Sequence, residues 1–502
     1  MLAEFKRRWS VFRSSPPALP RMRLGPEGSH DNPLMLQFFT WESKHKEISW
    51  WKHLETEIPK LAEMGFTQVW LPPPNKGADE NGRGYDAYDL VLCIKNEGTV
   101  KTRWGTRDEL LQACKVATSH GVDIIIDAVL NHKLGADRFE TFPAVPVNAQ
   151  NRLKDEGPVR DIDGWTAFDF TGRGGKYSTF RWTHQHFTGL DWDHRTRTGG
   201  IYRIAGKGQK GWSKHVDSEL GNYDYLLGVD IDHRNLEVIS TTSATGFRLD
   251  AIKHIDQRFL LRFITHVRER CRSPQMFTVS EYWSGDLKLI LPYIRAFNGE
   301  TAFFDVPLHM NFHQASKHRS RYDLRTILNN TIVKVKPKDA VTFVDNHEYV
   351  QGQSLESWVE DNFKIQAYAL ILLRQDGHPC VFYGDLYPND QCYNEHISQR
   401  VTLLIEARKQ FAYGRSEDYL HDRNCIGFVR MGDSKHPGCA VILSNKEETN
   451  DHVHTIRMFV GRVHASSVFR SFMSQQGRVD IDSDGWGNFS CFADSMEVWV
   501  KS

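Results

Sequence analysis

The sequence predicts an α/β protein: a (β/α)8 TIM barrel with an inserted β-rich subdomain after strand 3 and a C-terminal antiparallel β-sandwich domain. Eight short runs rich in β-forming residues alternate with longer runs of helical periodicity, which is typical of a closed parallel sheet. One interval breaks this rhythm and is too long for a plain loop. After about Gly414 the pattern changes to short alternating strands separated by turn signals.

The barrel is expected to occupy residues 31–132 and 236–413. Its predicted strands are residues 34–39, 68–71, 122–129, 246–251, 276–281, 301–306, 340–345 and 380–383. The clearest helical patterns between them are residues 50–64, 107–120, 257–271 and 360–375.

The remaining segments complete the predicted organisation. Residues 133–235 are rich in Gly, Asp and aromatic side chains and should form the inserted subdomain. The C-terminal domain, residues 414–502, has predicted strands at 425–431, 440–444, 455–460 and 496–500. Residues 1–30 are expected to be a flexible basic tail.

Composition narrows the class of protein. The chain has 63 Lys and Arg and 63 Asp and Glu, which argues against nucleic acid or an anionic membrane as an obligate partner. No apolar run is long enough to span a bilayer. The eight cysteines are scattered without a C-x-x-C pair, and the first thirty residues lack the apolar stretch of a secretory signal. We expect a cytoplasmic protein with free thiols, and a monomer.

Residues 246–254 alternate apolar and polar side chains, so Arg248 and Asp250 should point to the same side of a strand. A neighbouring guanidinium favours the ionised form of a carboxyl group, which suits a nucleophile. A structural Arg–Asp ion pair explains these nine residues equally well.

The polar residues at the ends of other predicted strands favour a catalytic role for Asp250 over a structural ion pair. In a parallel barrel the active site lies at the C-terminal ends of the strands. Strand five ends at Glu281, strand seven at Asn346-His347-Glu348, and strand three at Asn131-His132. Two carboxyl groups that face each other across a barrel mouth are the requirement for cleaving a glycosidic bond. Asp250 is then the ionised nucleophile, and Glu281, beside Tyr282 and Trp283, is the acid/base whose pKa rises through desolvation.

These segments resemble the four signature regions of the α-amylase family of glycoside hydrolases, most closely the liquefying bacterial and intracellular fungal α-amylases. Further similar runs are residues 37–41, 69–73, 221–225, 304–308, 352–357 and 382–385. The resemblance implies hydrolysis of internal α-1,4 bonds of glucans with retention of configuration. It assigns Asp250 as nucleophile, Glu281 as general acid/base and Arg248 as the partner beneath the nucleophile.

The resemblance also implies the residues that bind substrate. His132 and His347 match groups that bind hydroxyls of the sugar at the cleavage point, and Tyr85 matches the ring that stacks under it. Lys253 and Trp283 match groups on the leaving-group side. For each lone His or Tyr the alternative is an ordinary core residue.

A calcium site follows from the same resemblance. Asn131, Asp224, Asp230 and the backbone carbonyl of His254 match the ligands of one structural Ca²⁺ ion, and oxygen ligands from separated segments suit this ion. Carboxylates that build additional metal positions in the liquefying enzymes are replaced by Thr188, Ser213 and Arg234. The alternative for Asp224 and Asp230 is that they cap turns.

Glu348 departs from the family, which has Asp as the third catalytic carboxylate at this position. The extra methylene displaces the carboxylate, so turnover on starch should be weak or shifted toward transfer of glucan units. Two alternatives therefore stay open: an α-glucan transglycosylase that uses the same residues, and a degenerate amylase that binds glucan and regulates polysaccharide synthesis.

Overall fold

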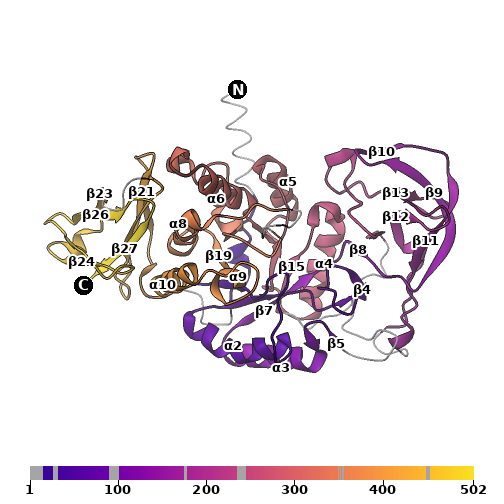
Figure 1. Ribbon diagram of the computed structural model, residues 1–502, viewed down its shortest axis with the longest axis horizontal. Helices are drawn as coiled ribbons and strands as arrows, with labels where there is room; N and C mark the ends of the chain where they lie inside the picture. The colour runs from indigo at the N-terminus through magenta and orange to yellow at the C-terminus, as the bar shows by residue number, and fades with distance from the viewer. Residues whose placement is uncertain are drawn as a thin grey trace.

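The computed structural model describes residues 15–25, 32–89, 101–173, 178–234, 245–348, 350, 352, 355–447 and 453–502. At its centre lies a closed barrel of eight parallel strands in the order β1-β19-β18-β17-β16-β15-β7-β2 (Figure 1). Their bounds are β1 (Met35–Gln37), β2 (Gln68–Leu71), β7 (Asp123–Ala128), β15 (Gly246–Leu249), β16 (Phe277–Ser280), β17 (Ala302–Phe304), β18 (Ala340–Phe343) and β19 (His378–Phe382). The predicted fold is confirmed, and each strand falls on one of the eight predicted runs.

Helices follow the barrel strands and cover their outer surface (Figure 1). They are α2 (Trp50–Met64), α3 (Arg107–Ser119), α4 (Gln257–Arg270), α5 (Leu287–Phe297), α6 (Val306–His318), α7 (Ile332–Val335), α8 (Asp361–Leu373), α9 (Tyr383–Leu386) and α10 (Glu395–Phe411). Local sequence sets their ends. In α3, the side chain of Thr106 accepts a hydrogen bond from the backbone of Glu109, whose carboxylate accepts one in return. In α2, Gly65 ends the helix at φ 102°, where a residue without Cβ is favoured.

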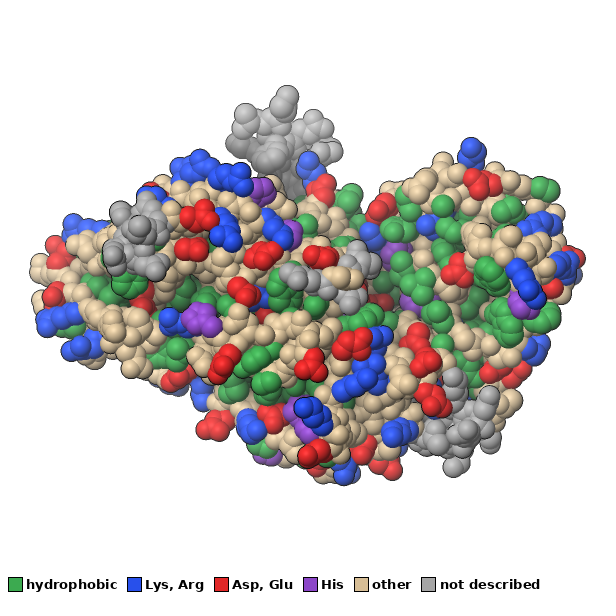
Figure 2. Space-filling view, viewed as in Figure 1, with side chains coloured by type: hydrophobic (Ala, Val, Ile, Leu, Met, Phe, Trp, Pro, Cys, Tyr) green, Lys and Arg blue, Asp and Glu red, His purple; other side chains and the backbone are tan. Residues whose placement is uncertain are grey.

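The insert leaves the barrel after β7 and returns before β15. Its strands are β8 (His132–Lys133), β9 (Arg138–Asn148), β10 (Asn151–Asp155), β11 (Arg160–Ala167), β12 (Phe187–Asp193), β13 (Thr198–Ile204) and β14 (Val229–Ile231). They form one sheet in the order β10-β9-β13-β12-β14-β8, with β11 paired to β9. This sheet has its own aromatic core, which includes Phe142, Phe168, Trp182 and Phe187. The molecular surface is hollowed between the insert and the barrel (Figure 2).

The C-terminal domain lies at the opposite end of the molecule (Figure 1). A six-stranded antiparallel sheet in the order β20-β21-β22-β27-β24-β25 faces the two-stranded sheet β23-β26 across a shared core. The strands are β20 (Ser416–Tyr419), β21 (Cys425–Arg430), β22 (Cys439–Ser444), β23 (Val453–Phe459), β24 (Val468–Ser471), β25 (Arg478–Asp480), β26 (Trp486–Phe492) and β27 (Met496–Lys501). The four strands predicted in this domain correspond to β21, β22, β23 and β27.

Residues 15–25 correct the expectation of a flexible tail over residues 1–30; residues 1–14 and 26–31 lie outside the described chain. The backbone N–H of Ala18 donates to Asp339 Oδ1 at 2.8 Å, and Arg23 pairs with Asp123 at 2.9 Å. Leu19 and Met22 are buried against the barrel. Burial of these apolar side chains holds the segment in place despite its basic composition. Among the described residues, no helix is long and apolar enough to cross a bilayer.

Candidate active site

Arg248 is the centre of the candidate site. It lies on β15 directly opposite Asp127 of the neighbouring strand β7. Its Nη1 is 2.8 Å from Asp127 Oδ1 and 2.5 Å from Asp250 Oδ1, and its Nη2 is 3.3 Å from Glu281 Oε2. The side chain is 1% exposed. One buried guanidinium therefore brings the carboxyl groups of Asp250 and Glu281 together at the C-terminal ends of β15 and β16.

The backbone fixes the positions of both carboxyl groups. The Asp250 N–H donates to Ala128 O at 3.3 Å and the Glu281 N–H to Leu249 O at 2.9 Å, which continues the barrel ladder beyond each strand. The chain then turns at Ala251, which has φ 47° and ψ 43°. A non-glycine residue in this left-handed region costs free energy, and such strain is concentrated at functional sites. Here the turn lets the Ala251 N–H donate to Glu281 Oε2 at 2.8 Å.

Burial dominates the ionisation of the pair. It raises the pKa of Asp250 to about 7, with the charge of Arg248 opposing the shift. Burial also raises the pKa of Glu281, again against Arg248. The expected increase at Glu281 is thus confirmed. Arg248 was expected to hold Asp250 ionised; its charge does lower the pKa of Asp250, but burial raises that pKa by more. One guanidinium shared among three carboxylates does not offset complete desolvation of Asp250.

Aromatic and imidazole rings form a wall beside the carboxyl groups. The Tyr85 ring is stacked on His347 with centroids 5.2 Å apart and on Trp41 at 5.7 Å. Tyr85 donates its hydroxyl to Asp127 Oδ2 at 2.7 Å, and His132 Nε2 lies 2.8 Å from Tyr85 O. Tyr85, Trp41 and His347 therefore form a flat surface beside the Arg248 cluster, and His132 lies against the backbone of Tyr85.

Glu348 lies next to this wall. Its Oε1 is 3.4 Å from His347 Nε2, and its backbone N–H donates to Asn346 Oδ1 at 2.8 Å. Burial opposes ionisation of Glu348, but the close contact with His347 and the charge of Arg248 together outweigh it, so the pKa of Glu348 is lowered. Its charge also acts on Asp250 and Glu281. Three carboxyl groups thus converge at the mouth of the barrel.

Lys253 and Trp283 lie where the barrel meets the insert. Lys253 Nζ is 2.8 Å from the carboxylate of Glu219, in the insert, and 3.4 Å from Trp283 O. Lys253 is therefore fixed by the insert, beside the turn that carries Asp250.

With this geometry established, comparison with known proteins identifies the family. The profile of the alpha amylase catalytic domain matches residues 42–428. The chain belongs to the alpha-amylase family. It is 40% identical to glucan 1,4-alpha-maltohexaosidase of Bacillus sp. (strain 707), over 96% of each chain. It is 40% identical to the alpha-amylase of Geobacillus stearothermophilus, over 93% of this chain and 87% of the relative.

Two further comparisons extend the likeness. The cytoplasmic alpha-amylase of Escherichia coli (strain K12) is 37% identical over 93% of this chain and 99% of the relative. The crystal structure of alpha-amylase from Geobacillus thermoleovorans, complexed with acarbose, superposes with a TM-score of 0.60 at 17% identity. That match covers 94% of this chain and 98% of the other, and it shows a shared fold.

The amylase-family chain holds a set of buried oxygen atoms between barrel and insert. Asn131, Asp224 and Asp230 are each 0% exposed. In the described part of the chain, the Oδ1 atom of each of these three residues has no hydrogen-bond partner. The charge of Asp224 also raises the pKa of Asp230, so the two carboxylates are close. Buried polar atoms are almost always satisfied, so three unpaired oxygens from separate segments fit a bound cation.

His254 lies beside this oxygen set. Its Nδ1 is 2.8 Å from Tyr223 O, the residue before Asp224. Within the described ranges, no three His, Cys, Asp or Glu side chains are grouped so as to hold a metal ion. The candidate site therefore depends on two carboxylates, one amide and backbone oxygen.

Hydrogen-bond donors lie beside Asp224 and Asp230. Thr188 donates its hydroxyl to Asp230 Oδ2, and the Ser213 N–H donates to Asp224 Oδ2 at 2.9 Å. Arg234 pairs with Asp232 at 2.6 Å. Thr188 and Ser213 thus occupy the second oxygens of Asp230 and Asp224, which fits a single ion better than a cluster.

Asp127 and Trp41 also belong to the active site, although they were not predicted as site residues. Asp127 accepts hydrogen bonds from Arg248, from Tyr85 and, at 3.1 Å, from Trp70 Nε1. Strand alignment was the available signal, because parallel neighbours that end together place Asp127 opposite Arg248. Trp41 lies in a loop after β1, and the available signal was its place at the end of residues 37–41, one of the runs similar to the family.

Proposed function

We propose that this alpha-amylase-family protein is a retaining glycoside hydrolase that cleaves internal α-1,4-glucosidic bonds of starch, glycogen or maltooligosaccharides. The single observation that carries the proposal is the convergence of Asp250 and Glu281 on Arg248. The relatives that are named alpha-amylase and glucan 1,4-alpha-maltohexaosidase, each similar over most of the chain, support the choice of substrate.

The two carboxyl groups divide the chemistry between them. Glu281, protonated, donates its proton to the glycosidic oxygen while Asp250, ionised, attacks the anomeric carbon and forms a covalent glycosyl-enzyme. Glu281 then removes a proton from water, which attacks the anomeric carbon and releases Asp250. The raised pKa of Glu281 suits the first step, since it keeps the acid protonated at higher pH than an ordinary carboxyl group.

The surrounding side chains orient the sugar. Tyr85 supplies a flat apolar surface, and His132 and His347 are the residues that bind hydroxyls of the sugar. In the described chain His347 Nε2 has no hydrogen-bond partner, whereas His132 Nε2 lies 2.8 Å from Tyr85 O. Glu348 grips hydroxyls of the sugar at the cleavage point. Lys253 and Trp283 act on the leaving-group side, next to the insert.

We further propose that one Ca²⁺ ion is held by Asn131, Asp224, Asp230 and the backbone carbonyl of His254. The unpaired oxygens of the first three support it. When bound, the ion neutralises two buried carboxylates and ties the insert to the barrel.

A glucanotransferase is the second candidate, and Glu348 is the observation that favours it. Its longer side chain changes the grip on the glycosyl-enzyme intermediate, which is the species that partitions between water and an acceptor sugar. We propose that the protein acts in the cytoplasm, as the name of the Escherichia coli relative indicates for that protein, and that it is a monomer.

A mechanism-based fluoroglycoside of maltose tests the proposal. We expect a covalent adduct on Asp250, located by peptide mass spectrometry, and no adduct in Asp250→Asn. With maltoheptaose as substrate, products longer than the substrate would establish transfer, and shorter products alone would establish hydrolysis. A chain that binds glucan but is never labelled would instead be a regulator, and the catalytic proposal would fail.

A further inference from the structure

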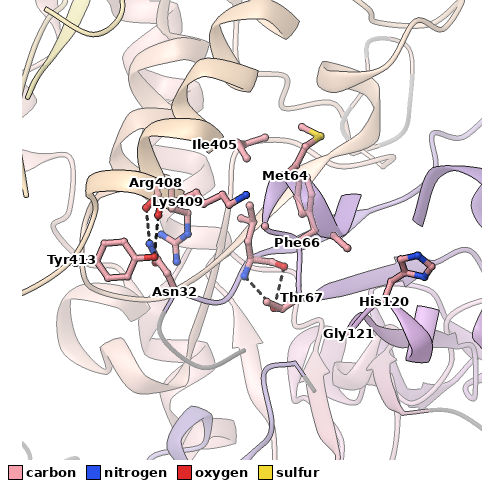
Figure 3. Close-up of a pocket in the computed structure, with 13 residues that line it drawn as sticks. Asn32, Met64, Phe66, Thr67, His120, Gly121, Ile405, Arg408, Lys409 and Tyr413 are labelled. Carbon is pink, nitrogen blue, oxygen red and sulfur yellow. Dashed lines mark hydrogen bonds between the residues drawn. The ribbon is translucent and has the colours of Figure 1, made fainter. Parts of the chain in front are cut away.

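A basic groove lies on the N-terminal side of the barrel, where the ends of α2 and α3 lead into β2 and β7. It consists of two adjoining cavities of about 290 and 720 Å³ that share Asn32, Arg408 and Tyr413. Figure 3 shows the smaller cavity, with Arg408, Tyr413 and Asn32 together at one end and His120 at the other. The catalytic carboxyl groups lie at the opposite ends of the strands, so the groove is independent of the proposed function.

The walls of the groove are strongly cationic. Among the described residues that line the two cavities, one is acidic, Asp433. Six described lining residues are cationic: Arg374, Arg408, Lys409, Arg415, Arg430 and Lys435. Two of them have carboxylate partners outside the lining, since Arg374 pairs with Asp418 and Arg415 with Glu417.

Arg408 of α10 and Arg430 of β21 form the buried centre of the groove, at 5% and 6% exposure. Both guanidinium groups donate to backbone carbonyls. Arg408 donates to Leu372 O of α8 and to Pro33 O, and Arg430 donates to Leu373 O of α8 at 2.9 Å and to Gly414 O. These bonds satisfy the helix end, but a carbonyl dipole does not neutralise a full charge. Across the described residues neither arginine forms an ion pair with a carboxylate, and Arg408 Nε has no hydrogen-bond partner.

The two buried cations also repel one another. Burial and the charge of Arg430 lower the pKa of Arg408 to about 9. Buried charges are costly unless a counter-charge and hydrogen bonds accompany them. An anion in the groove would supply both, and the planar fork of a guanidinium matches the oxygens of a phosphate group.

A second unpaired group points to a ligand that also has hydroxyls. His378 Nε2 lies 2.7 Å from Gln68 Oε1, an acceptor, so this nitrogen carries the proton. Burial lowers the pKa of His378 to about 3, which keeps the ring neutral. Its Nδ1 is therefore an acceptor, and in the described chain it is buried without a partner. A ligand hydroxyl can donate to it. Tyr413 and His436, stacked with centroids 3.5 Å apart, supply a flat wall nearby.

We propose that this groove binds a small sugar phosphate, with the phosphate against Arg408 and Arg430 and a hydroxyl directed to His378. The ligand would join α10, the end of α8 and β21 of the C-terminal domain. Binding would therefore stabilise the junction between the barrel and that domain.

Calorimetry and thermal unfolding of the full chain at constant ionic strength test the proposal. The probes are glucose 6-phosphate, inorganic phosphate, sulfate and glucose. We expect saturable binding and a raised Tm with glucose 6-phosphate, and binding about tenfold weaker with inorganic phosphate, because that probe lacks the hydroxyl contacts. Binding of phosphate and sulfate equal to that of the ester would indicate a simple anion site, and absence of saturation at about 10 mM of every probe would overturn the proposal.

Variants locate the site. Arg430→Gln should weaken glucose 6-phosphate binding by about tenfold or more, because it removes a charge-assisted contact. In case that variant does not fold, Lys409→Gln with Lys435→Gln removes two exposed cations and should weaken binding by about threefold at unchanged Tm. The matched control, Lys52→Gln with Lys288→Gln, changes exposed lysines of α2 and α5 outside the groove and should bind as the wild type does. Equal loss in test and control pairs would refute the location.

Discussion

The replacement Glu348→Asp tests how the third carboxylate sets the rate. Removing one methylene withdraws the carboxylate by about 1.5 Å, the length of one carbon–carbon bond. Glu348 Oε1 is now 3.4 Å from His347 Nε2, a long contact, while the backbone N–H of Glu348 is fixed by Asn346. The displacement is therefore taken up by the side chain alone.

A misplacement of about 1 Å at a reacting centre costs about a hundredfold in rate. If Glu348 holds its carboxylate away from the position that the family uses, Glu348→Asp should raise kcat by up to about a hundredfold, which is about 2.7 kcal/mol of transition-state stabilisation. KM should change little, since the interaction strengthens mainly in the transition state.

Steady-state kinetics on maltoheptaose and soluble starch, with time-resolved product analysis, measure this effect. Glu269→Asp makes the same chemical change on the exposed face of α4 and should leave kcat unchanged. Glu348→Gln keeps the length but removes the charge and should lower kcat. An unchanged or lower kcat in Glu348→Asp would refute the reasoning and indicate that the cleft is adapted to the longer side chain.

Three further predictions follow from the buried charges. Burial raises the pKa of Asp250 to about 7, and protonated Asp250 cannot attack, so kcat/KM should fall about tenfold per pH unit below that value. A pH profile of kcat/KM that is flat down to a pH of about 5 would contradict the assignment of Asp250 as nucleophile. Removal of calcium with a chelator should lower the free energy of unfolding by about 2.7 kcal/mol, compared with the protein in free calcium at a hundred times its Kd. In Asn131→Ala the effect of calcium on the free energy of unfolding should be much smaller. An equal effect of calcium in the variant and the wild type would exclude the proposed ligand set. Lys364 is buried between Asp345 at 3.0 Å and Asp385 at 2.8 Å. Lys364→Met leaves both carboxylates without their cation and should destabilise the fold by about 3–5 kcal/mol in denaturant unfolding. The control Lys288→Met, on the surface, should destabilise it far less.

Strand-end reasoning predicted much of the site. The side chains of Asp250, Glu281 and Glu348 follow β15, β16 and β18, and a closed parallel barrel requires its strand ends to meet at one mouth. Helix α2 was predicted at its observed bounds from helical periodicity, and the structure has Ser49 and Gly65 as the caps of its two ends. In the C-terminal domain, β24 and β25 are short and contain exposed polar residues, so periodicity alone did not distinguish them from turns.

Properties that depend on burial were not accessible from sequence. The neighbouring Arg248 suggested a readily ionised Asp250, but the extent of desolvation, which decides the pKa, is set by the folded barrel. Ala18, Leu19 and Met22 are interspersed with Pro and Arg, and only the folded structure provides the apolar surface that they cover. Asp127 is likewise identified by its alignment with Arg248 on a strand distant in sequence.

The position of the insert has a consequence for the order of folding. Asp127 and Arg248 face each other across β7 and β15 although 121 positions separate them along the chain. If the insert folds first, His132 pairs with Asp230 and the chain between them no longer counts toward the loop. The remaining connection is the five positions from Asp127 to His132 and the eighteen from Asp230 to Arg248. Closing the shorter loop costs about 1.4 kcal/mol less chain entropy. Early folding of the insert should therefore accelerate closure of the barrel, and variants that unfold the insert should refold slowly even when the barrel sequence is intact.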